Sequence, residues 1–353
     1  METEAVRNAV TIMTSIILSI SDLSFVFWLT ALSFALAIGL TPLLTNYLYE
    51  NRIWKQPKDT AITGEKAPVY AKLHKAKHKR LVPTMAGVLI WGVVALVTVL
   101  FNLDRAGTWL PLFTLITAGV LGLIDDYINI RTTKSGIKGL NATIKLVLQL
   151  VIGVAGAWWF YYKLGFDILH VPGFGDFSIG LLYIPLFILV IVSTANAVNI
   201  SDGLDGLAGG LVAIAFTAYS IIALTQGKLE LAAFCGSIAG ATLAYTWFNV
   251  HPARFFMGDT GALALGATLG VVAMLTNQAL VLLVIGGVFV IETLSSMAQI
   301  ASKRWFGRKI FLSAPIHHHF EAIGWPETKV TMRFWVLGAI FAVVGLVIAF
   351  LGK

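Results

Sequence analysis

The polar residues best suited to chemistry lie in a short segment between two apolar runs. Segment 195–206 separates the apolar stretches 181–192 and 207–224. It carries two amides and two carboxylates at every third position: Asn196, Asn199, Asp202 and Asp205. On a continued helix this spacing would place neighbouring side chains on one face, and ionisable residues at membrane depth are costly and usually functional. The segment is therefore a candidate site; the alternative is a solvated loop in which Asp205 only caps the next helix.

A pair of adjacent acids, Asp125 and Asp126, ends another apolar run. Adjacent helical residues point about 100° apart. One carboxylate can therefore face a site while the other faces a supporting residue. The alternative is a simple hydrophilic end to a span, although the span ends of this chain are otherwise basic.

A further acid, Asp259, lies between Gly258 and Gly261 at the start of an apolar run. The glycines allow a tight turn, and the following helix could present its N-terminal N–H groups to an anion; the alternative is a helix cap. Together the acids suit a hard divalent cation such as Mg²⁺, which takes one or two carboxylates plus substrate phosphates. The sequence contains neither GxxxxGK[ST] nor HExxH, so P-loop and zincin chemistry are unsupported.

Three consecutive histidines, His317, His318 and His319, form the last cluster. Adjacent residues cannot readily converge on one tetrahedral zinc ion. Hydrogen bonding or charge stabilisation of phosphate oxygens is the preferred interpretation.

The composition predicts a polytopic membrane protein. Of the 353 residues, 58% are hydrophobic and 12% charged, and the mean hydropathy is +0.83. The single Cys235 excludes a disulfide or CxxC framework. A spanning helix needs about 20 apolar residues, so the short first apolar stretch is expected to be an interfacial helix at 8–20 and not an eleventh span. Ten spans are predicted: 24–48, 82–101, 108–125, 141–162, 178–195, 207–224, 229–248, 260–276, 278–301 and 331–351.

Lysine and arginine residues set the predicted orientation. The odd-numbered loops 49–81, 126–140, 249–259 and 302–330 hold nine, three, one and five of them, eighteen in all, against three in the even-numbered loops. The positive-inside rule then places the odd loops in the cytoplasm and both termini outside. All four polar clusters fall on this cytoplasmic face. The net charge of +7 is therefore interpreted as membrane orientation and not as nucleic-acid binding.

Five motifs, in order along the chain, resemble those of the bacterial phospho-N-acetylmuramoyl-pentapeptide transferases, within the polyprenyl-phosphate N-acetylhexosamine-1-phosphate transferase superfamily. The resemblance extends from about residue 24 to the C-terminus, and the unbroken triple histidine followed by Phe-Glu points to the muramoyl branch. The motifs are Pro-Thr-Met-Ala-Gly at 83–87, Asp-Asp-Tyr at 125–127, Asn-Ala-Val-Asn-Ile-Ser-Asp-Gly-Leu-Asp-Gly at 196–206, Phe-Met-Gly-Asp-Thr-Gly at 256–261 and Ala-Pro-Ile-His-His-His-Phe-Glu at 314–321.

The resemblance implies an all-α enzyme of the bacterial inner membrane, with ten transmembrane helices in a single domain, 1–353, and a cytoplasmic active site. It would transfer phospho-MurNAc-pentapeptide from UDP-MurNAc-pentapeptide to undecaprenyl phosphate, giving lipid I and UMP, with Mg²⁺ required. Membrane lipid and a second copy of the chain, in a homodimer, would be its partners.

The resemblance also implies residue roles. Asp259 would be the metal ligand, and Asp125, Asp126, His317 and His318 would be catalytic. Substrate-binding residues would be Lys79, Thr84, Asn199, Asp202, Asp205, Asn249, Phe256 and His319. Small departures from the family pattern are Val82, Ala86, Thr260 and Ala262.

The residues leave the mechanism open. Either an aspartate deprotonates undecaprenyl phosphate, which attacks the donor directly, or an aspartate attacks first and forms a phosphosugar-enzyme intermediate; direct attack is preferred, since two positioned substrates and a metal suffice. A secondary transporter would have buried acids near the membrane midplane in repeated halves, whereas these acids lie at predicted helix ends and no repeat is evident. A membrane scaffold would leave the acids and histidines unexplained.

Overall fold

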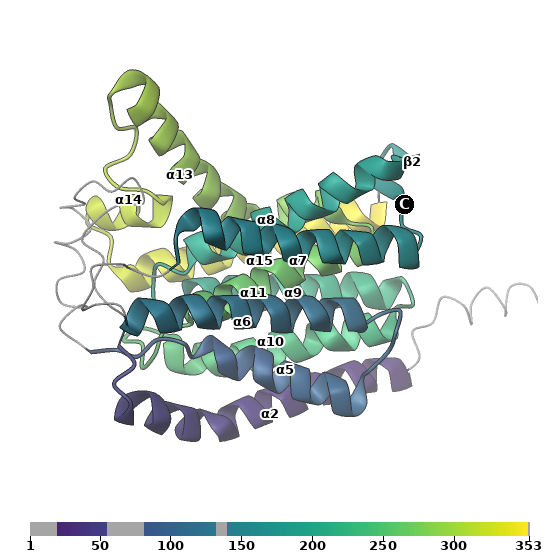
Figure 1. Ribbon diagram of the computed structural model, residues 1–353, viewed down its shortest axis with the longest axis horizontal. Helices are drawn as coiled ribbons and strands as arrows, with labels where there is room; N and C mark the ends of the chain where they lie inside the picture. The colour runs from purple at the N-terminus through teal and green to yellow at the C-terminus, as the bar shows by residue number, and fades with distance from the viewer. Residues whose placement is uncertain (1–19, 55–80, 132–139, 352–353) are drawn as a thin grey trace, which may run out of the picture.

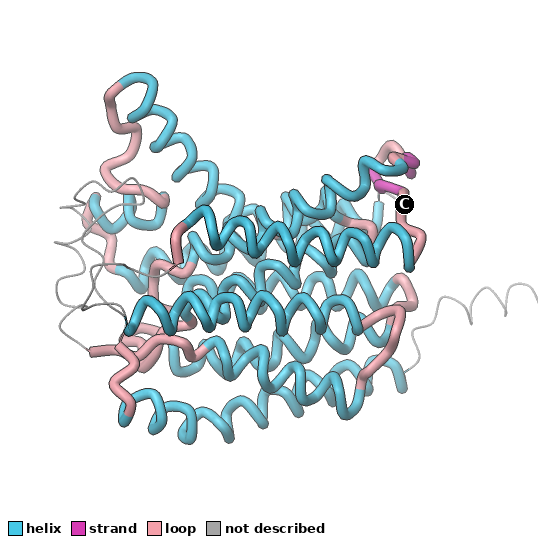
Figure 2. Tube along the Cα trace, in the orientation of Figure 1, coloured by secondary structure: helices cyan, strands magenta, loops and turns pink. Residues whose placement is uncertain are grey.

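The structure is a helical bundle. This computed structural model describes residues 20–54, 81–131 and 140–351. Within these ranges the chain is almost entirely helical, and most helices run along the longest axis (Figures 1 and 2). The interfacial helix expected at 8–20 and the candidate residue Lys79 lie outside the described residues, apart from Ile20 itself.

Helices make up most of the described residues. The α-helices are α2 (Ile20–Glu50), α5 (Gly87–Phe101), α6 (Trp109–Arg131), α7 (Ala142–Trp158), α8 (Tyr183–Ser201), α9 (Leu207–Thr225), α10 (Leu229–Asn249), α11 (Gly258–Leu275), α12 (Ala279–Ile285), α13 (Gly287–Phe306), α14 (Ile316–Ala322) and α15 (Glu327–Leu351). A π-helical turn, η2 (Trp159–Lys163), extends α7, and a 3₁₀ turn, η3 (Gly180–Leu182), precedes α8. Between them β1 (Ile168–Val171) and β2 (Gly175–Ser178) form an antiparallel hairpin that pairs Ile168 with Ser178.

The helices confirm an all-α polytopic membrane protein. Within the described ranges, eight helices are long and apolar enough to cross a membrane, and α12 with α13 could make a ninth, bent span. The helix α5 has only 15 residues, fewer than the roughly 20 needed to cross a bilayer. The count of ten spans therefore stays a prediction.

The most buried helix, α11, lies at the centre of the bundle. Its apolar window is 94% buried, compared with 83% for α10 and 78% for α9, whereas those of α2, α7, α8 and α15 are only 22–28% buried. The outer helices thus expose apolar side chains such as Phe27 and Val343, as lipid-facing helices do. The central position of α11 places its first turn against several neighbours at one end of the bundle.

Small residues allow helices to pack closely around α11, as is common in membrane bundles. A Cβ added at Gly87 of α5 would lie 2.3 Å from Gly261 Cα, and one at Gly266 would lie 2.5 Å from the Thr194 carbonyl of α8. On α6, a Cβ at Gly122 would lie 2.2 Å from the carbonyl oxygen of Asp259. These contacts fix α5, α6 and α8 around the N-terminal half of α11.

The start of α5 differs from the sequence prediction. The span was expected from residue 82, but the helix begins at Gly87. The preceding residues pair instead with the segment before α11: Phe256 N donates to Pro83 O at 2.8 Å and Ala86 N to Phe256 O at 3.0 Å. An extended backbone is favoured before a proline. Because Pro83 O and Ala86 N bond to Phe256, they are not available for the hydrogen bonds of a longer helix.

The predicted ninth span, 278–301, is broken. The helices α12 and α13 meet at Gly286 and Gly287 with a bend of 82°, and a glycine pair is a common site of sharp kinks. Figure 1 shows α13 leaning away from the bundle towards α14. Its buried face is polar and includes Glu292, Ser295 and Gln299, so α13 contributes side chains to the polar end of the molecule.

The two described ends of the chain lie at the same end of the bundle. Figure 1 shows the start of α2, the C-terminal end of α15 and the β-hairpin at one end, and α14 at the other. This arrangement agrees with an even number of crossings; which face is cytoplasmic stays a prediction.

Candidate active site

An acidic centre forms where α6 and α11 meet at the α14 end of the bundle. Asp125 and Asp126 lie on α6, which continues to Arg131 beyond the predicted end of its span, and Asp259 lies in the first turn of α11. Lys145 Nζ lies 2.6 Å from Asp125 Oδ2 and also contacts Asp259 Oδ2. Asp126 Oδ2 accepts a hydrogen bond from the backbone N–H of Thr260 at 3.1 Å. The structure thus brings together the three acids singled out in the sequence.

Two glycines make this approach possible. The close contact of Gly122 with the Asp259 carbonyl sets the spacing of α6 and α11. Gly258 has φ +75°, a conformation that L side chains rarely adopt. A Cβ added there would lie 2.4 Å from Asp126 Oδ2 and 2.9 Å from Thr84 Oγ1, which also places the Thr84 hydroxyl beside the acidic centre. The turn at Gly258 therefore allows the Asp259 carboxylate to lie close to the two acids of α6.

Lys145 is a site residue that the sequence analysis missed. It lies in the first turn of α7, and α7 begins at an Asn141 cap whose side chain accepts from Thr143 N. Because it falls inside the predicted span 141–162, it was counted in no loop. A lysine inside an apolar span is itself a signal of function, and that signal could have identified it.

The polar segment 195–206 divides into two parts, because α8 ends within it. The helix ends at Ser201, so Asp202 and Asp205 do not continue its face as a longer helix would. The side chain of Asn199 lies beside Asp259 and belongs to the acidic centre. Asn196 instead donates to Gln149 Oε1 at 2.9 Å. The threefold spacing therefore does not gather all four residues at one point.

Asp205 is part of a buried brace between three segments. Its Oδ2 lies 3.0 Å from His251 Nδ1 and accepts from Ala253 N at 3.1 Å, and its own N–H donates to Glu327 Oε1 at 2.6 Å. These bonds join the α8–α9 turn, the α10–α11 loop and the start of α15. Asp205 does not cap α9, because the N-cap is Gly206.

Asp205, His251 and Glu327 of this brace could also hold a metal ion, because one ligand atom of each lies within 4.8 Å of the others. Among the residues that the structure describes, no other group of three His, Cys, Asp or Glu side chains meets this criterion. The hydrogen bonds above already account for this geometry. We therefore interpret it as structural, and regard the acidic centre, whose Asp259 side chain is 25% exposed, as better suited to a cation that also meets a substrate.

The residues expected to hold the donor are partly engaged within the protein. Asn249 is buried, with Oδ1 accepting from Gly206 N at 2.9 Å and Nδ2 donating to Phe255 O at 2.7 Å. Phe256 is half-buried, between the α5 entry and the turn that precedes α11. The structure thus places Asn249 as a support for the site's loops, and its donor contact stays a prediction.

The three histidines have three different environments. His317 and Glu292 are fully buried, with His317 Nδ1 2.8 Å from Glu292 Oε2. His318 Nδ1 lies 2.7 Å from Glu321 Oε2. His319 Nδ1 accepts from Leu312 N at 3.3 Å. They do not converge on one point, and each ring is oriented by its own partner.

His317 also touches the polar segment. A Cβ added at Gly203 would lie 2.3 Å from His317 Nε2, and this buried nitrogen has no hydrogen-bond partner within residues 20–54, 81–131 and 140–351. Glu292 was missed by the sequence analysis because it lies within the predicted span 278–301; as with Lys145, an acid at membrane depth was the available signal.

One departure from the family pattern has a structural reason. Thr260 is fully buried, and its hydroxyl donates to Gly119 O at 2.9 Å and accepts from Trp91 Nε1 at 3.1 Å. The hydroxyl is therefore satisfied, and its backbone N–H remains available to Asp126. Nothing in the structure explains Val82, Ala86 or Ala262.

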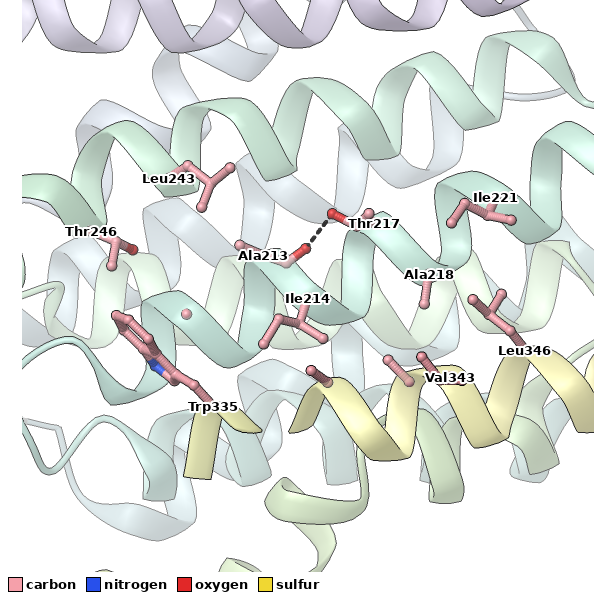
Figure 3. A pocket seen from close by; sticks show the side chains of 13 residues that line it. Ala213, Ile214, Thr217, Ala218, Ile221, Leu243, Thr246, Trp335, Val343 and Leu346 are labelled. Carbon is pink, nitrogen blue, oxygen red and sulfur yellow. Dashed lines mark hydrogen bonds between the residues drawn. The ribbon is translucent and has the colours of Figure 1, made fainter. Parts of the chain in front are cut away.

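A separate groove of about 390 Å³ lies between α9, α10 and α15 (Figure 3). Ile214, Leu243, Trp335 and Val343 line it, and the hydroxyl of Thr217 is turned to the Ala213 carbonyl. Among the described residues, none that lines this groove carries a carboxylate, an amine or an imidazole, so the groove is not the acidic centre.

Comparison with known proteins agrees with the motifs. Residues 108–277, which include Asp125, Asp126, Lys145 and Asp259, match the model of glycosyl transferase family 4. A phospho-N-acetylmuramoyl-pentapeptide-transferase of Geobacillus thermodenitrificans is 41% identical over 324 residues, 90% of this chain and 96% of that protein. Proteins of the same name from Chloroflexus aurantiacus and Anoxybacillus flavithermus are 43% identical over 281 residues (76% and 77%) and 37% identical over 322 residues (90% and 95%).

The alignments cover 77–96% of the length of these relatives, and the three acids of two of the motifs meet at one end of the bundle. The chain therefore belongs to the family of phospho-N-acetylmuramoyl-pentapeptide transferases.

Proposed function

We propose that this protein transfers phospho-MurNAc-pentapeptide from UDP-MurNAc-pentapeptide to undecaprenyl phosphate, producing lipid I and UMP in peptidoglycan synthesis. A phosphate oxygen of the lipid forms a bond to the β-phosphorus of the donor. The bond between that phosphorus and the bridging oxygen breaks, and UMP leaves with the electron pair. The observation that carries this proposal beyond family membership is the meeting of Asp125, Lys145 and Asp259 at one end of the bundle.

The centre has the groups that this reaction needs. Both substrates are phosphate anions that repel each other, so the site must position them and offset their charge. Asp125 has the more buried carboxylate, 8% exposed compared with 25% for Asp259. We assign Asp125 as the group that accepts the lipid phosphate's proton, with Asp126 holding the first turn of α11 through Thr260 N.

The donor set fits Mg²⁺. Carboxylate oxygens of Asp259 and Asp125 meet at one place, where a cation, the Lys145 ammonium, already bridges them, and the side chain of Asn199 lies beside Asp259. Asp259 would be the principal ligand, with Asp125 beside it. The ion would offset phosphate charge and orient the donor's pyrophosphate.

The remaining assignments follow from position. His317 and His318 would contact the sugar-phosphate part of the donor, and Asp202 and Phe256 its nucleotide. Lys79 and His319 would bind substrate, as the family resemblance implies. The protein would lie in the bacterial inner membrane with this end of the bundle in the cytoplasm and both termini outside, as a homodimer.

A two-phase assay tests the reaction. Radiolabelled UDP-MurNAc-pentapeptide should become butanol-extractable only when undecaprenyl phosphate and Mg²⁺ are added. Asp125→Asn should abolish this signal, whereas Asp176→Asn, on the β-hairpin at the opposite end, should not. No extractable label from folded wild-type protein would refute the proposal, and uptake of an intact solute into proteoliposomes without UMP release would establish a transporter instead.

The same protein distinguishes the two mechanisms. With donor and Mg²⁺ but no lipid, direct attack predicts no UMP release. A burst of one UMP per active site from lipid-free enzyme, with a trapped phosphosugar, would establish the covalent route.

A further inference from the structure

Lys145 occupies the position that a cation bound by Asp259 would take. Its Nζ lies 2.6 Å from Asp125 Oδ2 and contacts Asp259 Oδ2, so one ammonium bridges the two carboxylates. A divalent ion binding these oxygens would come too close to the ammonium, and the two positive charges would repel. The lysine and the metal therefore cannot both hold Asp259 in this arrangement.

The surroundings permit the lysine to leave. Lys145 has a flexible four-carbon stem on the first turn of α7, and its side chain is 21% exposed. Asp125 stays fixed without it, because its Oδ1 accepts from Leu140 N at 2.6 Å. Asp259 is held by the first turn of α11, whose Thr260 N–H donates to Asp126 Oδ2 at 3.1 Å. Neither acid needs the ammonium to hold its position once another cation replaces it.

We propose that Lys145 is an exchangeable internal cation: it neutralises Asp125 and Asp259 while the site is empty, and it leaves Asp259 when a divalent cation binds. The released ammonium stays within reach of the same site, where it can pair with a phosphate of the incoming donor. This second step rests on the proposed function; the exchange between lysine and metal does not.

The exchange predicts that removing the ammonium tightens metal binding. In Lys145→Met, which keeps the length but not the charge, the Kd for Mn²⁺ measured by electron paramagnetic resonance on substrate-free protein should fall at least tenfold below that of wild type. Lys163→Met removes a lysine at the far end of the same helical segment and should leave the Kd unchanged. Transferase activity of Lys145→Met should fall, since the phosphate loses its partner.

Two further variants locate the metal. Adding Asp259→Asn to Lys145→Met should abolish the tighter site, whereas adding Glu327→Gln, in the brace, should not. A Kd in folded Lys145→Met equal to or weaker than that of wild type would overturn the proposal, as would a tight site that survives Asp259→Asn.

A measurement on the wild type covers the case in which Lys145→Met does not fold. A structure with Mn²⁺, located by its anomalous signal, should show the ion on Asp259 and Lys145 Nζ beyond 4 Å from Asp259. An ion on Asp259 with the Lys145 contact intact would refute the exchange. Because neither experiment needs a substrate, its failure is distinguishable from failure of the transfer assay.

Discussion

The close packing of Gly122 against the backbone of Asp259 should be needed for activity, although Gly122 itself has no side chain that could bind substrate. In Gly122→Ala the added Cβ would meet the Asp259 carbonyl oxygen at 2.2 Å, its carbon at 2.4 Å and Thr260 N at 2.5 Å. Ordinary contact begins at 3.4 Å, and all three atoms are backbone, so no side chain can rotate away. The helices α6 and α11 would have to separate by roughly 1 Å, a displacement that can cost about 100-fold in rate.

The substitution should also destabilise the protein. Overpacking of this kind costs about 1–3 kcal/mol. Gly92→Ala on α5 is the matched control, because its Cβ would meet nothing within 4 Å, and alanine is the better helix former by up to about 1 kcal/mol. Gly122→Ala should therefore lower both the thermal unfolding temperature and kcat, whereas Gly92→Ala should preserve both.

The butanol-extraction assay at saturating substrates, with unfolding followed by tryptophan fluorescence, measures both effects. Folded Gly122→Ala protein with wild-type turnover would refute the reasoning, because it would mean that the α6–α11 spacing does not set the geometry of Asp125 and Asp259.

The other expectations concern the histidines, the brace, the topology and the assembly. Glu292→Leu leaves the buried His317 Nδ1 without its partner and should cost about 1–3 kcal/mol of stability, whereas Glu292→Gln, which can still accept a hydrogen bond, should recover most of it in thermal unfolding. Glu327→Ala removes the acceptor of Asp205 N–H and should expose the α8–α9 turn to faster hydrogen exchange without changing Mn²⁺ binding. Cysteines added at the two termini should react with impermeant reagents from the outside only; labelling solely from the cytoplasm would reverse the topology. Native mass spectrometry in mild detergent should show a dimer, and a monomer at all detergent concentrations would argue against it.

The fold class and the acidic centre could be predicted because they depend on local signals. Long apolar runs predict spanning helices, and acids beside such runs are conspicuous, which is why Asp125, Asp126 and Asp259 were identified. What joins them is not local. Lys145 is one basic residue in an apolar helix, and only the packing of α6 against α11 shows that it reaches both acids.

The breaks in helices were harder to predict. A run of apolar residues at 278–301 has the length of a span, and hydropathy alone does not reveal the 82° bend at Gly286. The late start of α5 depends on pairing with residues more than 160 positions away. The structural role of Asp205 was equally hard to predict. Its partners His251 and Glu327 come from distant segments, so the sequence shows only an acid beside an apolar run.

The brace around Asp205 also bears on how the enzyme is made. It joins the turn after α8 to Glu327 and, through Asp205 O and Thr331 Oγ1 at 3.2 Å, to the last spanning helix. A ribosome-bound chain whose α15 has not entered the membrane lacks these partners, although its acidic centre is already complete in sequence. The polar turn beside that centre therefore gains its contacts with α15 only at the end of synthesis, so a chain truncated before α15 would contain every acid of the site but would hold this turn through the α10–α11 segment alone.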